Sequence, residues 1–143
     1  MQAILLGRAD EFEPLHIPLF LDNVPAGFPS PASDYAEKTL DLNELCITRP
    51  AATYFVRAQG DSMIEAGIFH DDVLVVDRSL TARHGDIVIA ELNGEMTVKR
   101  LELHPRLRLM PMNAGHEPIR IPEGSDLEIF GVVTTVVHSL RKP

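Results

Sequence analysis

From residue 53 onward, apolar and polar residues alternate over short stretches that end at Gly, Pro, Asn or Asp. This pattern predicts β-strands with one buried face. The predicted strands are residues 53–58, 73–77, 86–92, 95–103, 107–110 and 127–137. Asn93-Gly94, between two of them, is the strongest hairpin signal in the chain and predicts a two-residue type I′ turn. We therefore expect a mainly β protein with folded antiparallel sheets that form a partial barrel, with short helices.

Helical spacing occurs only in short pieces. Leu42, Leu45 and Cys46 are spaced i, i+3, i+4 behind a possible N-cap at Asp41, and Glu44 occupies the capping-box position. This spacing predicts a short helix with Cys46 on its apolar face. A single helical turn is expected at residues 63–66.

Residues 1–32 have a different character. They contain five of the eleven prolines, which disfavour regular helix because proline fixes φ and lacks a backbone donor. Apolar residues are interspersed among these prolines. We expect residues 1–32 to form an extended N-terminal arm that docks on another surface, and residues 33–143 to form the β-rich domain.

Composition limits the classes of function. The 143 residues include 13 Lys and Arg against 21 Asp and Glu, which gives a net charge of −8. A chain this acidic is a poor candidate for direct, specific DNA binding, which needs clustered basic residues. The single cysteine excludes an internal disulfide. No apolar run reaches the roughly 18 residues of a membrane span, and no signal peptide is evident, so we expect a cytoplasmic protein.

Ser62 is the first candidate catalytic residue. It lies in Gly60-Asp-Ser-Met-Ile64, between a predicted strand and a predicted helical turn. A serine there would present its hydroxyl and backbone N–H at the start of the turn, where they could stabilise a developing oxyanion. The alternative is that Ser62 or Asp61 only caps the turn. The segment is not a G-x-S-x-G elbow, because Ile64 stands at the second glycine position.

Lys99 is the second candidate. Strand alternation places it on one face with Thr97, Leu101 and Leu103. A lysine among leucines can be partly buried, and burial lowers the amine pKa towards values at which the amine accepts a proton from serine. The alternative is that Lys99 extends to water from a sheet edge.

The histidines provide no distinct site. None forms an i, i+4 pair, and H-E-x-x-H is absent, so we expect neither a metal site nor a cofactor. Their spacing leaves a Ser–His–Asp triad open but singles out no histidine.

Eight segments together resemble the UmuD-like branch of the LexA-like family of serine/lysine self-cleaving peptidases. They are Gly27-Phe-Pro-Ser-Pro-Ala-Ser-Asp34, Asp41-Leu-Asn43, Ala52-Thr-Tyr-Phe-Val56, Gly60-Asp-Ser-Met-Ile64, Gly85-Asp-Ile-Val-Ile89, Thr97-Val-Lys99, Pro111-Met-Asn113 and Phe130-Gly-Val-Val133. Each segment is weak alone, but their order and spacing are specific, and the resemblance extends from about residue 20 to residue 140.

The resemblance implies a site and a biological role. Ser62 would be the nucleophile, Lys99 the general base and Ala26-Gly27 the scissile bond. The implied role is SOS mutagenesis: a homodimer cleaves itself when stimulated by a RecA–single-stranded-DNA filament. The processed chain then joins a UmuC-like subunit of a translesion DNA polymerase of the polymerase V type.

Other functions are compatible with these residues. The chain could be a non-enzymatic polymerase-binding module, or an antirepressor, in which the Ser62/Lys99 pair is not used. A signal-peptidase-like enzyme shares the serine/lysine chemistry, but the expected absence of a membrane anchor argues against it.

Overall fold

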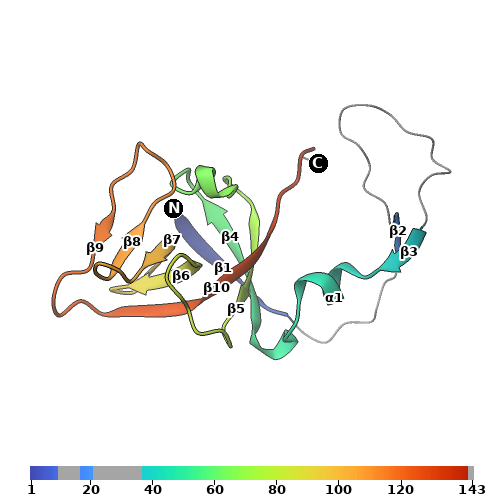
Figure 1. Cartoon of the computed structure of the whole chain (residues 1–143), viewed down its shortest axis with the longest axis horizontal. Coiled ribbons are helices and arrows are strands. Elements are labelled where there is room, and N and C mark those ends of the chain that lie inside the picture. The colour runs from blue at the N-terminus through green and yellow to red at the C-terminus, as the bar shows by residue number, and fades with distance from the viewer. Residues whose placement is uncertain (10–16, 21–36, 142–143) are drawn as a thin grey trace.

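The computed structural model describes residues 1–9, 17–20 and 37–141 (Figure 1). Its strands and helices, in chain order, are β1 (Gln2–Arg8), β2 (Ile17–Phe20), β3 (Glu37–Leu40), α1 (Leu42–Cys46), the 3₁₀ turn η2 (Pro50–Ala52), β4 (Thr53–Gln59), the 3₁₀ turn η3 (Ile64–Ala66), β5 (Val73–Asp77), β6 (Ile87–Leu92), β7 (Glu95–Glu102), β8 (Arg108–Met110), β9 (Ile119–Arg120) and β10 (Leu127–Val137). The chain is therefore mainly β.

The main sheet closes on itself. Its strand order is β1-β4-β5-β10-β6-β7-β8-β9, and a further pairing joins β1 to β7. That pairing makes a six-stranded barrel of β1, β4, β5, β10, β6 and β7, with β8 and β9 continuing the sheet beyond β7. The strand pairs of the barrel are antiparallel, so the expected folded antiparallel sheet with barrel character is confirmed. Figure 1 shows β1, β4 and β7 beside one another near the N-terminus.

The six strands predicted from alternation are all present, with small differences at their ends. The hairpin prediction is also confirmed: Asn93 and Gly94 have φ of 50° and 85°, the two positive values that a type I′ turn requires. The sheet encloses a core of fully buried side chains, among them Val56, Leu74 and Ile89.

The short helix forms as predicted, but its leucines do not pack inward. Asp41 is its N-cap, and its side chain accepts a hydrogen bond from the Asn43 N–H at 3.0 Å. Leu42 and Leu45 are 63% and 61% exposed, so the apolar spacing does not produce a buried face here. Cys46 is partly buried against the cluster that contains Ile47.

The predicted arm is described only in part. Ala26 and Gly27, which the resemblance places at the scissile bond, lie outside the described residues. Gln2–Arg8 is a strand of the barrel, and Ile17–Phe20 pairs with Glu37–Leu40 in a separate two-stranded sheet. The division of the chain at residue 32 stays a prediction.

Gly131 has no room for a side chain. A Cβ there would lie 2.6 Å from Val76 Cγ1 and 3.2 Å from the Asp77 carbonyl oxygen. We expect Gly131→Ala to lower the free energy of unfolding by about 1–3 kcal/mol, because it overpacks a closed sheet. Chemical denaturation measures this. Gly115→Ala is the control, since its Cβ would meet only Asn113 Oδ1 at 3.7 Å; equal stability of the two variants would contradict the prediction.

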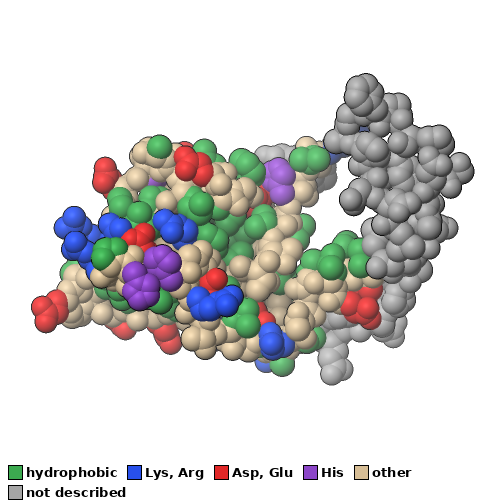
Figure 2. Space-filling view, viewed as in Figure 1, with side chains coloured by type: hydrophobic (Ala, Val, Ile, Leu, Met, Phe, Trp, Pro, Cys, Tyr) green, Lys and Arg blue, Asp and Glu red, His purple; other side chains and the backbone are tan. Residues whose placement is uncertain are grey.

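The surface carries mixed charge. Figure 2 shows basic side chains gathered at one end of the viewed face, with acidic side chains near them. Within the chain, Glu102 forms ion pairs with both Arg100 and Arg108, so part of the basic charge is already neutralised. No helix of the described residues is long and apolar enough to cross a membrane.

Candidate active site

Ser62 lies in a braced turn at the end of β4. Gly60, with φ of 99°, turns the chain out of the strand. The Ser62 carbonyl accepts a hydrogen bond from the Met112 N–H at 2.7 Å, and the Asn113 side-chain amide donates to the Asp61 carbonyl at 2.8 Å. The turn is therefore held by two adjacent residues of a segment far away in the sequence. The sequence pattern assigned no task to Asn113, because a contact across 52 residues leaves no signal in local spacing.

Lys99 projects from β7 towards that turn. Its Nζ lies 3.0 Å from Ser62 Oγ, 3.2 Å from Thr97 Oγ1 and 3.2 Å from the Val98 carbonyl oxygen. Lys99 is 4% exposed and Ser62 is 1% exposed. The alternative in which Lys99 extends to water is therefore wrong. The structure brings together the two residues that the sequence analysis singled out, although 37 positions separate them.

The surroundings of Lys99 favour its neutral form. The three hydrogen-bond partners of Nζ are two hydroxyls and a carbonyl, none of which carries a charge. A neutral amine can donate to the Thr97 hydroxyl and the Val98 carbonyl while its lone pair accepts from the Ser62 hydroxyl. Burial lowers the pKa of Lys99 below its ordinary 10.5, and a hydrogen bond with the chain's amino terminus opposes this in part. A neutral amine beside a hydroxyl is the arrangement that general-base catalysis needs.

The Met1 end of the chain also reaches this site. The Met1 amine donates a hydrogen bond to Ser62 Oγ at 2.8 Å, and the Met1 carbonyl accepts one from Thr97 Oγ1 at 2.7 Å. Burial, followed by the hydrogen bond and the charge of Lys99, lowers the pKa of the Met1 amine to about 5. The sequence analysis missed this contact, because nothing in the first residues indicates which strand they pair with.

The structure gives Ser62 no histidine partner among the described residues. The hydrogen-bond partners of its Oγ are the Met1 amine and Lys99 Nζ. His116 contacts Asp61 Oδ1 at 2.7 Å, and His138 contacts Asp72. The geometry is that of a dyad rather than a Ser–His–Asp triad.

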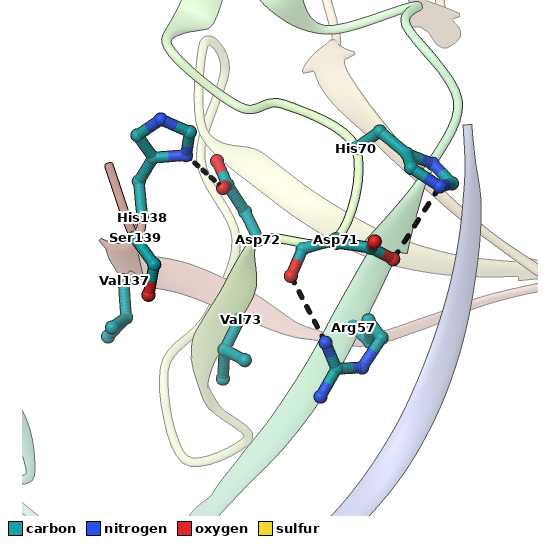
Figure 3. A pocket seen from close by; sticks show the side chains of 8 residues that line it. All are labelled: Arg57, His70, Asp71, Asp72, Val73, Val137, His138 and Ser139. Carbon is teal, nitrogen blue, oxygen red and sulfur yellow. Dashed lines mark hydrogen bonds and ion pairs between the residues drawn. The ribbon is translucent and has the colours of Figure 1, made fainter. Parts of the chain in front are cut away.

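Two pockets lie on the strands of the barrel, and only one of them is next to the dyad. One, of about 220 Å³, is beside the dyad and has Met1, Gln2, Thr97 and Lys99 in its wall. The other, of about 470 Å³, does not reach the dyad (Figure 3). Its lining residues are Arg57, His70, Asp71, Asp72, Val73, Val137, His138 and Ser139. Figure 3 shows His138 turned towards Asp72 and His70 towards Asp71, so these polar groups are engaged with one another.

No group of three His, Cys, Asp or Glu side chains in the described ranges could hold a metal ion. The reactive groups that the structure places at this site are the hydroxyl of Ser62 and the amine of Lys99.

Comparison with known proteins places the chain in a family. The model of the Peptidase S24-like family matches residues 18–134. The chain is 55% identical to protein SamA of Salmonella typhimurium over 140 residues, which cover 96% of this chain and 98% of SamA. It is 57% identical to protein ImpA of Escherichia coli over 87% of this chain and 86% of ImpA. It is 43% identical to the LexA repressor of Alcanivorax borkumensis over 80% of this chain and 56% of that protein. These matches confirm the resemblance to LexA-like peptidases, and the chain belongs to the Peptidase S24-like family.

Proposed function

We propose that this chain is a self-cleaving serine peptidase in which Ser62 is the nucleophile, Lys99 is the general base and Ala26-Gly27 is the scissile bond. The observation that supports these roles is the 3.0 Å contact between Ser62 Oγ and Lys99 Nζ, with both side chains almost fully buried. Membership of the Peptidase S24-like family supports the reaction class.

The reaction begins with proton transfer. Neutral Lys99 accepts the hydroxyl proton of Ser62 as Oγ attacks the carbonyl carbon of Ala26. The carbonyl oxygen becomes an oxyanion near the Ser62 backbone N–H. Among the described residues no acceptor competes for that amide, and a backbone N–H in this position can stabilise the developing charge.

The leaving group departs with the same proton. When the tetrahedral intermediate collapses, the bond between Ala26 and Gly27 breaks, and Lys99 protonates the nitrogen of Gly27. Water then attacks the ester between Ala26 and Ser62, with Lys99 again as the base, and releases Ser62. Ala26 and Gly27 suit a narrow cleft because their side chains are minimal.

The substrate segment is tethered to the active site, so even a slow active site can cleave it. Gly27 and Ser62 are 35 positions apart in the sequence, and a linker of that order raises the local substrate concentration to roughly millimolar. The same tether reaches either the chain's own site or that of a partner in a homodimer.

The biological role that we propose is SOS mutagenesis in the cytoplasm. A RecA–single-stranded-DNA filament would favour the state in which the arm enters the site, which is a shift between two existing conformations. The processed chain, residues 27–143, would then serve as an accessory subunit of a UmuC-like translesion polymerase. The net charge of −8 supports protein partners over direct DNA contact.

Intact-mass measurement tests this proposal. The purified chain is incubated with RecA, a nucleotide and single-stranded DNA, and with each of these omitted in turn. We expect a fragment that begins at Gly27 to accumulate only in the complete mixture at neutral pH. If the intact mass persists there and also at alkaline pH, the chain is a binding module or antirepressor with an unused dyad.

A further inference from the structure

The nucleophile of this site is covered. Ser62 is 1% exposed, so its Oγ cannot meet a peptide carbonyl in the arrangement observed. The Met1 amine lies 2.8 Å from that oxygen. A Cβ built on Gly60, two residues before Ser62, would lie 3.6 Å from Met1 Cα. The Met1 end of β1 is therefore in contact with the turn that presents the nucleophile.

Strand pairing holds β1 in this place. Gln2 pairs with both Gln59 of β4 and Thr97 of β7, and Ala3 pairs with Ala58. The Met1 carbonyl accepts hydrogen bonds from Thr97 Oγ1 at 2.7 Å and from the Val98 N–H at 3.1 Å. Met1 and Ala3 also pack against the core. The start of β1 thus bridges β4, which leads into the Ser62 turn, and β7, which carries Lys99.

The rest of β1 pairs with β4 as far as Arg8, but its side chains contribute little to the core. Ile4, Leu5 and Leu6 are 42%, 43% and 47% exposed, and the pairing with β4 is irregular between Leu5 and Gly7. One residue pair joins β1 to β7. The pocket of about 220 Å³ lies where β1 meets β7, between the start of β1 and Lys99. Withdrawal of β1 would extend that pocket towards Ser62.

We propose that β1 is a removable strand that closes the approach to Ser62, and that the substrate segment enters the channel between β4 and β7 only after the Met1 end of β1 has left it. The proposal rests on the roles of Ser62 and Lys99 proposed above. The part of the chain around Ala26-Gly27 and the strand β1 then compete for one channel. An activator need only stabilise the state in which β1 is displaced.

A disulfide lock tests the requirement for movement. Gln2→Cys and Gln59→Cys place two thiols on directly opposed residues, whose Cα separation in an antiparallel pair suits a disulfide. Cys46→Ala removes the competing thiol. We expect the oxidised protein to cleave itself at least about tenfold more slowly at alkaline pH than the same protein after reduction. Equal rates in the two redox states would overturn the proposal while leaving the dyad in place.

A second measurement does not depend on catalysis. Ser62→Cys, again with Cys46→Ala, reports access to the site through its rate of alkylation by iodoacetamide. Adding Ala3→Asp sets a carboxylate against the core and should release β1, whereas Ile4→Asp adds the same charge at an exposed position. We expect Ala3→Asp to accelerate alkylation at least about tenfold over Ile4→Asp. Equal alkylation rates in two folded proteins would overturn the proposal, even if the chain proves to have no peptidase activity.

Discussion

Ser62→Ala and Lys99→Met are each expected to leave the chain uncut, with the fold preserved. Ser62→Ala removes the nucleophile, and we expect the rate of self-cleavage to fall by a factor of roughly 10⁴ or more. Lys99→Met removes the general base while keeping the length and apolar stem of the side chain, with an expected fall of about 10²–10⁴. Intact-mass measurement after incubation at alkaline pH gives both rates.

The stability of these variants separates chemistry from folding. A buried lysine is costly in its charged form, so Lys99→Met should unfold at an equal or higher temperature than the natural chain. Ser139→Ala, at an exposed serine, is the control and should cleave at the natural rate. A fragment beginning at Gly27 from either dyad variant would show that the role assigned to that residue is wrong.

Strand positions could be predicted from the sequence because local alternation reports them. In β7, the same alternation placed Lys99 on a face with Thr97. In the structure, the lysine amine is hydrogen-bonded to the Thr97 hydroxyl. The alternation within one strand does not predict how close that strand lies to another strand. Only the closure of the barrel, in which β1 lies between β4 and β7, brings the turn after β4 next to Lys99.

The pairing of β1 could not be predicted for a related reason. Residues 3–6 are a continuous apolar run, Ala-Ile-Leu-Leu, which has no period and therefore does not indicate which strands it would pair with. Three of the four remain substantially exposed in the folded chain, so burial does not explain the strand. Its cause is the backbone pairing with β4 and β7, which are far away in the sequence.

For helix α1, the prediction of the cap was correct and the prediction of a buried face was wrong. Its cap chemistry is local, and the prediction from Asp41 is confirmed by the bond to the Asn43 N–H. Its apolar spacing implied a buried face, yet Leu42 and Leu45 are exposed. A five-residue helix presents too few positions for spacing to define which side meets the core.

Raising the pH is expected to accelerate self-cleavage in the absence of RecA. The active form of Lys99 is the neutral amine, so below its pKa the rate should rise about tenfold for each pH unit and become constant above it. Burial lowers the pKa of Lys99 from 10.5, so the plateau should begin below pH 10.5. The Met1 amine, with a pKa lowered to about 5, is already neutral at pH 7 and does not produce the rise above that pH.

Initial rates of fragment formation between pH 6 and pH 10 measure this profile. His116→Gln is the matched control, because His116 is hydrogen-bonded to Asp61, the residue next to the nucleophile. We expect this variant to keep both the slope and the plateau, since His116 does not contact Ser62 Oγ. A rate that is flat across the range contradicts a lysine base, and a profile that shifts in His116→Gln assigns the proton transfer to the imidazole instead.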